Sequence, residues 1–176
     1  MIIWVNGAFG SGKTTLVAEL RRRMPESLVY DPEQTGFVLR GVVEVPTGDF
    51  QDLPLWRSQV AGMAIGLARE YGRPVLVPMT LVDPRYAEEI FGALEAAGVT
   101  ARHFFLAVTA SELEARLDAR VLCPDDSERD ESARAWCKAQ VPRCVAAADE
   151  LRGGAVLLDG ELPTPELADR VMAMLG

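Results

Sequence analysis

The chain has 176 residues, of which 49% are hydrophobic and 25% are charged, and its formal net charge at pH 7 is −8. This composition predicts one globular domain with a substantial core, and it excludes a disordered chain or a solenoid. The acidic balance also argues against general binding to nucleic acid, which normally requires a basic face.

The cysteines and the apolar runs indicate the compartment. Three cysteines, at positions 123, 137 and 144, form no C-x-x-C pair and leave one unmatched, which favours reduced thiols over a disulfide framework. The apolar start "MIIWV" is too short for a secretory signal, and no apolar run approaches the roughly 20 residues of a membrane span. We therefore expect a soluble, cytoplasmic protein.

The stretch "NGAFGSGKTT" follows the first apolar run and precedes a segment with helical spacing. It matches G-x-x-x-x-G-K-[ST], in which backbone N–H groups surround phosphate oxygens and the lysine reaches the β and γ phosphates. A strand, a glycine-rich loop and a helix form the context that this motif requires. We expect Thr14 to hold Mg²⁺. The predicted nucleotide-binding residues are Gly7, Ala8, Phe9, Gly10, Ser11, Gly12, Lys13, Thr14 and Thr15.

Further apolar, β-rich runs occur at "SLVYD", "PVLVPM", "HFFLAV" and "AVLLD", and segments with helical periodicity separate them. This alternation predicts an α/β fold with a parallel sheet covered by helices. Ligands of such sheets bind outside the carboxyl ends of the strands, so residues that directly follow a strand are candidates for chemistry.

The second predicted strand ends in "YDPE", which places Asp31 near the phosphate loop. Its carboxylate could accept the proton of an attacking hydroxyl or help to hold Mg²⁺, or it could simply cap the next helix. Glu33 is a weaker candidate that also suits the first turn of that helix. The third strand is followed by "TLVDP" and lacks the acidic residue of an ordinary Walker B motif, which disfavours a motor ATPase or a switch GTPase.

Residues 32–72 are far more than one crossover helix requires, and we interpret them as an acceptor-binding insert. Arg40, Trp56 and Arg57 could hold anionic and planar groups there, whereas most apolar side chains of the insert have the spacing of core residues. His103 begins a later strand without an obvious partner, and we assign it no chemistry.

Arg116 and Arg120 are four residues apart, so they share one face of a predicted helix. Phosphoryl transfer requires positive charge on the transferring group, which these arginines could supply, or they could pair with acidic neighbours on a solvated face. The polar interval "CPDDSERDES" that follows is a candidate mobile loop. Residues 121–134 are a candidate lid, to which Arg129 or Arg134 could contribute.

The strings "MIIWVNGAFGSGKTT", "YDPE", "DFQDLPLWR", "VPMT" and "QVPRC", in this order, resemble the tunicamycin resistance protein family of bacteria over most of the chain. The resemblance implies a three-layer P-loop NTPase fold similar to nucleoside monophosphate, shikimate and chloramphenicol kinases, with a five-stranded parallel sheet in the order 2-3-1-4-5 and a lid. It also implies ATP at residues 10–15 and an acceptor such as tunicamycin, a uridine-containing, lipid-linked antibiotic. Family members that extend beyond the last helix have been linked to membranes, and because this chain stops at Gly176, the resemblance does not carry membrane association over to it.

Three functions fit these patterns. The first is a small-molecule kinase, in which Lys13 and Mg²⁺ on Thr14 neutralise the β and γ phosphates. In that kinase Asp31 would orient or deprotonate the acceptor hydroxyl, while Arg116 and Arg120 would cover the transferring group. The second is a protein that binds and sequesters tunicamycin under the control of ATP, and the third is a housekeeping nucleotide or metabolite kinase.

Overall fold

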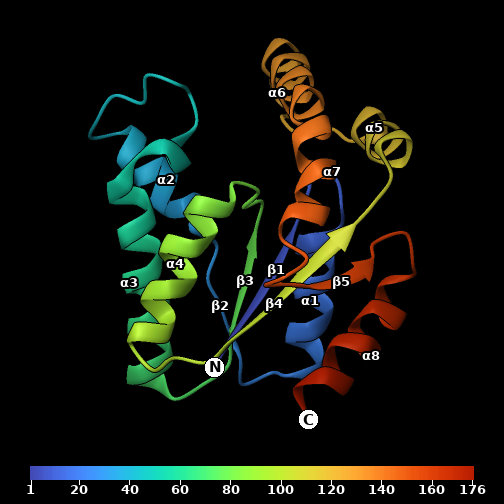
Figure 1. Cartoon of the computed structure of the whole chain (residues 1–176). Coiled ribbons are helices and arrows are strands. Elements are labelled where there is room, and N and C mark those ends of the chain that lie inside the picture. The colour runs from blue at the N-terminus through green and yellow to red at the C-terminus, as the bar shows by residue number, and fades with distance from the viewer.

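A computed structural model describes residues 1–176 and contains a five-stranded sheet with helices on both faces (Figure 1). All paired strands are parallel, in the order β2-β3-β1-β4-β5, which confirms the predicted fold class. The strands are β1 (Ile2–Gly7), β2 (Leu28–Val29), β3 (Val75–Met79), β4 (Ala101–Ala107) and β5 (Val156–Asp159). The helices are α1 (Lys13–Arg23), α2 (Pro32–Arg40), the 3-10 helix η1 (Phe50–Asp52), α3 (Pro54–Tyr71), α4 (Pro84–Ala96), α5 (Ala110–Ala119), α6 (Ser127–Ala139), α7 (Val141–Glu150) and α8 (Thr164–Leu175).

The central strands are apolar on both faces because helices cover both sides of the sheet. Along β1, Ile3 and Val5 pack towards α1 and α8, whereas Ile2 and Trp4 belong to the core under α3 and α4. The edge strand β2 is shorter than its apolar run predicts, although Tyr30 N still donates to the carbonyl of Leu76 at 3.0 Å. The sheet thus brings the carboxyl ends of β1, β3 and β4 together beside the loop that precedes α1.

Helices α5 and α6 lie beyond the carboxyl ends of the strands, and α7 continues from α6 down to the sheet (Figure 1). The predicted loop over residues 123–132 is shorter than expected, because α6 already begins at Ser127. The Asp126 carboxylate, which accepts a hydrogen bond from Arg129 N at 2.9 Å, caps this helix and explains its early start. The candidate lid therefore consists of a short loop and the first turns of α6.

None of the helices combines the length and the apolarity that a lipid bilayer crossing requires.

Candidate active site

The loop between β1 and α1 has the backbone of an anion-binding site. Three of its glycines have positive φ angles: 145° at Gly7, 81° at Gly10 and 95° at Gly12. A β-carbon at Gly7 would lie 2.7 Å from Ser11 Oγ, so that position admits no side chain. Gly12 is the N-cap of α1, and no side chain caps the helix. The first N–H groups of α1 are consequently available to an anion at the positive end of the helix dipole.

Lys13 is folded back onto this loop. Its Nζ donates to the carbonyl of Ala8 at 2.7 Å and lies 5.7 Å from the ring centroid of Phe9. Burial lowers the pKa of Lys13 to about 8, although the negative charge of Glu33 acts in the opposite direction. The ammonium is therefore held at the loop by a neutral carbonyl, which a phosphate oxygen could replace as the stronger partner.

A cavity of about 570 Å³ opens in front of the loop. Its walls are the loop, Arg116 and Arg120 from α5, and the segment from Gly160 to the start of α8. Arg116 donates to the carbonyls of Ser11 at 3.4 Å and Gly160 at 3.2 Å, and its Nε donates to the Glu112 carboxylate at 2.7 Å. Arg120 is exposed at the end of α5, and its positive charge adds to burial in lowering the pKa of Lys13. Three cationic side chains thus surround one cavity.

The Glu33 carboxylate, in the first turn of α2, interacts electrostatically with Lys13, and Asp31 lies beside Glu33 at the start of that helix. Asp31 caps this helix, because its Oδ1 accepts a hydrogen bond from Glu33 N at 2.9 Å. Burial and the neighbouring Asp31 raise the pKa of Glu33, whereas the charges of Lys13, Arg120 and Arg40 lower it. Glu33 therefore belongs to the same electrostatic cluster as Lys13.

The structure does not bring Arg40, Trp56 and Arg57 together on an open wall. Trp56 is fully buried: its indole N–H donates to the carbonyl of Pro32 at 3.1 Å, and its ring packs 5.4 Å from Phe50. Arg40 is the exposed member of the three, and its guanidinium lies 5.0 Å from the centroid of Phe50.

Arg57 is also part of the layer formed by α3 and α4. It is 8% exposed, pairs with Glu89 at 2.5 Å and donates to the carbonyl of Gln51 at 2.6 Å. Its guanidinium lies 4.1 Å from the ring centroid of Tyr86. Trp56 and Arg57 therefore support the insert from within, because the indole N–H of Trp56 and the Nε and Nη1 groups of Arg57 already have protein partners.

Two further arginines belong to the candidate lid. Arg134 pairs with Asp130, whose carboxylate also accepts hydrogen bonds from the backbone N–H groups of Leu122 and Cys123. Arg129 is exposed on the first turn of α6 and forms no ion pair. Arg134 thus stabilises the short loop, whereas the Arg129 side chain remains available.

A buried polar network fixes the base of the phosphate loop. The Asn6 carbonyl oxygen accepts hydrogen bonds from Gly7 N at 2.7 Å and Leu81 N at 2.9 Å, and its Nδ2 donates to the carbonyl of Leu81 at 2.5 Å. The same Nδ2 lies 3.1 Å from His103 Nε2, and the His103 ring stacks on Phe91 at 4.6 Å. The expectation that His103 has no partner is wrong, because strand pairing places Asn6 and His103 on adjacent strands. Burial lowers the pKa of His103 to about 4, so the ring is a neutral acceptor for Asn6.

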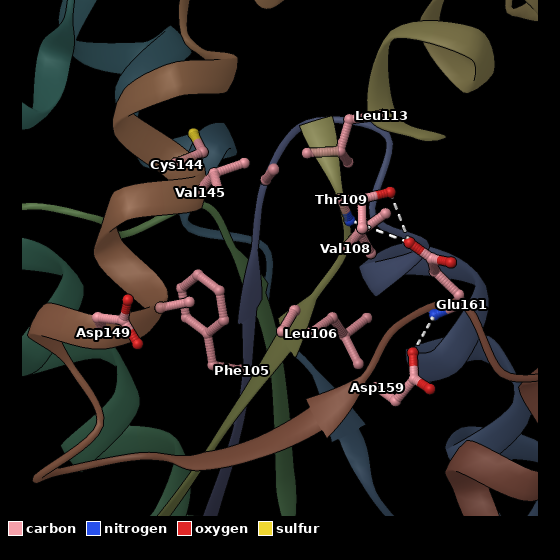
Figure 2. Close-up of a pocket in the computed structure, with 13 residues that line it drawn as sticks. Phe105, Leu106, Val108, Thr109, Leu113, Cys144, Val145, Asp149, Asp159 and Glu161 are labelled. Carbon is pink, nitrogen blue, oxygen red and sulfur yellow. Dashed lines mark hydrogen bonds between the residues drawn. The ribbon is translucent and has the colours of Figure 1, made fainter. Parts of the chain in front are cut away.

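A second cavity, of about 500 Å³, lies between β4, the end of β5 and α7 (Figure 2). The Glu161 carboxylate at its edge accepts hydrogen bonds from Thr109 N at 3.0 Å and Thr109 Oγ1 at 2.7 Å, and Glu161 N donates to Asp159 at 3.0 Å. These hydrogen bonds hold the segment that contains Gly160, whose carbonyl accepts from Arg116. The residues at the edge of this second cavity therefore hold one wall of the first cavity, which lies in front of the loop.

The residues around the loop fit a magnesium nucleotide. Thr14 is exposed on the first turn of α1, beside the uncapped N–H groups of that helix. No group of three His, Cys, Asp or Glu side chains could hold a metal ion by itself. An Mg²⁺ ion here would take most of its ligands from phosphate oxygens and water, which is its usual behaviour at phosphate-binding sites.

Known proteins share this architecture. A family model described as an AAA domain matches residues 2–144. Among solved structures, the tunicamycin resistance protein of Deinococcus radiodurans aligns with a TM-score of 0.74 and 25% identity, over 99% of this chain and 95% of that chain. This alignment confirms the resemblance that the sequence motifs predict. No curated protein matches the chain in sequence.

Two kinases align with lower identity. A gluconokinase from Sinorhizobium meliloti has a TM-score of 0.63 and 16% identity, over 99% of this chain and 90% of that chain. The APS kinase of Mycobacterium tuberculosis, in complex with AMPPNP and APS, has a TM-score of 0.62 and 16% identity, over 99% and 96% of the two chains. The chain therefore belongs to the AAA domain family and has the P-loop fold of small-molecule kinases.

Proposed function

We propose that this protein is an ATP-dependent phosphotransferase that transfers the γ-phosphoryl group to a hydroxyl of tunicamycin. The observation that carries the proposal is the charge arrangement around Lys13: the glycine-rich loop and two arginines line one cavity, and the Glu33 carboxylate, with Asp31 beside it, interacts electrostatically with Lys13. Such an arrangement suits phosphoryl transfer, in which positioning and electrostatic stabilisation account for almost all of the catalysis. The alignment with the Deinococcus radiodurans protein supports tunicamycin as the acceptor.

The nucleotide would bind to the loop from Gly7 to Thr15. Backbone N–H groups would surround the phosphates, the Lys13 ammonium would neutralise the β and γ oxygens, and Thr14 would hold Mg²⁺. When bound, the magnesium nucleotide supplies the phosphoryl group that is transferred. Arg116 and Arg120 would add positive charge from the α5 side of the cavity, where Arg116 already touches the loop carbonyl of Ser11.

The acceptor would approach from the side of α2, over the insert of residues 32–72. Asp31 would orient the hydroxyl or take its proton, and it is also a second candidate for contact with Mg²⁺. Glu33 is the alternative base, because burial raises its pKa and makes it a stronger proton acceptor than an exposed carboxylate. Arg40 would hold an anionic part of the acceptor, whereas Trp56 and Arg57 would support this wall from beneath. Residues 121–134 would close over the bound ligands as a lid.

The first experiment is mass spectrometry of tunicamycin after incubation with the purified protein and Mg-ATP. A gain of about 80 Da, the mass of one phosphoryl group, is expected with the intact loop and not with Lys13→Ala. Tight ATP-dependent binding of tunicamycin without this gain would favour sequestration. Neither binding nor a mass gain would direct the search to nucleotide and sugar acceptors, tested by competition.

Two carboxylate variants identify the base. Asp31→Asn is expected to lower the transfer rate by about 10²-fold or more while nucleotide affinity is retained, because the amide keeps the helix cap but cannot accept a proton. Glu33→Gln is the matched comparison. If Asp31→Asn transfers at the wild-type rate and Glu33→Gln does not, the proton acceptor is Glu33.

A further inference from the structure

Thr80 is the residue directly after β3, and its side chain is unusual in this protein. It is 0% exposed, and its Oγ1 has no hydrogen-bond partner. A buried hydroxyl without a partner costs free energy, and native structures contain few such groups. Thr80 also occupies the place after the third strand where an ordinary P-loop protein has an acidic residue.

The strand pattern indicates where this hydroxyl points. In β3, Leu76 packs in the core that includes α1, whereas Val75 and Val77 pack in the core on the opposite face. Successive side chains of a strand alternate between the two faces, so Thr80 falls on the same face as Leu76. Helix α1 covers that face.

The neighbouring strand ends at the phosphate loop. Asn6 of β1 is in register with Met79, so the continued register places Thr80 beside Gly7, the first residue of the loop. The Asn6 side chain holds both backbone polar groups of Leu81 and thereby fixes the position of this segment. The unpartnered hydroxyl thus lies on the α1 face of the sheet, beside the first residue of the loop.

We propose that Thr80 replaces the acidic Walker B residue, and that its hydroxyl is a hydrogen-bond partner for a water molecule on the Mg²⁺ of the bound nucleotide. This inference rests on the proposed nucleotide binding. Thr80 is a positioning residue, because it would act on the metal through that water, and its missing partner would be supplied only when the magnesium nucleotide is present.

A neutral hydroxyl at this place changes the behaviour of the site. A buried carboxylate would be costly before Mg²⁺ arrives, since an uncompensated buried charge is strongly destabilising. The hydroxyl avoids that cost but attracts the cation less. The metal should therefore bind together with the nucleotide, and not to the free protein.

The test measures the affinity for AMPPNP at increasing Mg²⁺ concentrations and in EDTA, by titration calorimetry on the full chain. Thr80→Val removes the hydroxyl and keeps the shape, whereas Thr80→Ser keeps the hydroxyl. We expect Thr80→Val to raise the half-saturating Mg²⁺ concentration about tenfold, which is the upper end of the effect of losing one ordinary hydrogen bond. Its affinity in EDTA should be unchanged, and Thr80→Ser should behave like the wild type.

Thermal unfolding without nucleotide separates this role from a purely structural one. Because the Thr80 hydroxyl has no partner in the protein, Thr80→Val should unfold at the same temperature as the wild type or higher. An unchanged Mg²⁺ dependence in Thr80→Val would overturn the inference, as would a wild-type protein that binds AMPPNP equally well without Mg²⁺. A Thr80→Val protein that unfolds at a lower temperature than the wild type and also binds AMPPNP more weakly in EDTA would likewise overturn the inference. Failure of the wild type to bind AMPPNP at all would instead refute the proposed function.

Discussion

Replacement of Lys13 by Met removes the charge at the phosphate loop and keeps an unbranched side chain. Burial lowers the pKa of Lys13 from 10.5 to about 8. This lower pKa means that folding disfavours the charged form of Lys13 by about 3 kcal/mol. Loss of the hydrogen bond to the Ala8 carbonyl offsets about 1 kcal/mol of that gain. We therefore expect Lys13→Met to raise the free energy of unfolding at pH 7 by about 2 kcal/mol.

The effect of Lys13 on the free energy of unfolding changes with pH in a predictable direction. Because the pKa of Lys13 in the folded state lies below its value in the unfolded state, the unfolded chain binds more protons between pH 8 and 10.5. The destabilisation caused by Lys13 is therefore fully present below pH 8 and disappears as the pH rises towards 10.5. The stability advantage of Lys13→Met should shrink over the same interval.

The same charge should control nucleotide affinity. If only the protonated lysine binds phosphate strongly, the wild-type affinity should fall by about tenfold per pH unit above pH 8. Arginine remains charged throughout this pH range, so the nucleotide affinity of Lys13→Arg should not change with pH.

Urea unfolding at pH 7 and pH 10, together with AMPPNP titrations from pH 6.5 to 9.5, would test this reasoning. A Lys13→Met variant that is less stable than the wild type at pH 7 would refute the stability argument. A wild-type affinity that stays constant up to pH 9.5 would refute the role of the buried ammonium.

Two further predictions concern the backbone of the loop and the network beneath it. Gly7→Ala should abolish nucleotide binding and destabilise the fold by more than about 1 kcal/mol, because Gly7 has a φ of 145° and its β-carbon would lie 2.7 Å from Ser11 Oγ. Gly62→Ala is the control, since space is open at Gly62 in α3 and alanine should stabilise that helix by about 0.5–1 kcal/mol. Asn6→Ala should lower the free energy of unfolding by about 3 kcal/mol or more in urea, because it leaves buried polar groups of Gly7 and Leu81 without partners. A loss below about 1 kcal/mol would show that water can replace the amide.

Local sequence patterns were sufficient to predict the fold class and the phosphate loop. The motif from Gly7 to Thr14 needs particular residues at fixed spacing, because its conformation depends on backbone angles that only glycine adopts easily. The parallel sheet followed from apolar runs that are buried on both faces. The helix cap at Asp31 is equally local, since its carboxylate accepts from an N–H two residues later.

The extent of burial could not be predicted in the insert. Trp56 and Arg57 looked like binding residues because tryptophan and arginine often recognise planar and anionic groups. Their partners, Pro32, Phe50 and Glu89, come from three different segments, and only packing brings these together. The role of Asp31 in catalysis stays a prediction, because its capping bond uses one carboxylate oxygen and says nothing about the other.

The sequence by itself determined the conformation of the glycine-rich loop between β1 and α1, because the fixed spacing of a short motif sets its own geometry. Only the tertiary structure decided which side chains meet there. The Glu33 carboxylate, which follows β2, interacts electrostatically with Lys13, which follows β1. The His103 ring on β4 lies next to the Asn6 amide on β1, and the buried Thr80 hydroxyl beside the loop has no hydrogen-bond partner. The physical reason is that strand order and register bring distant residues to one edge of the sheet, and no pattern along the chain records that proximity.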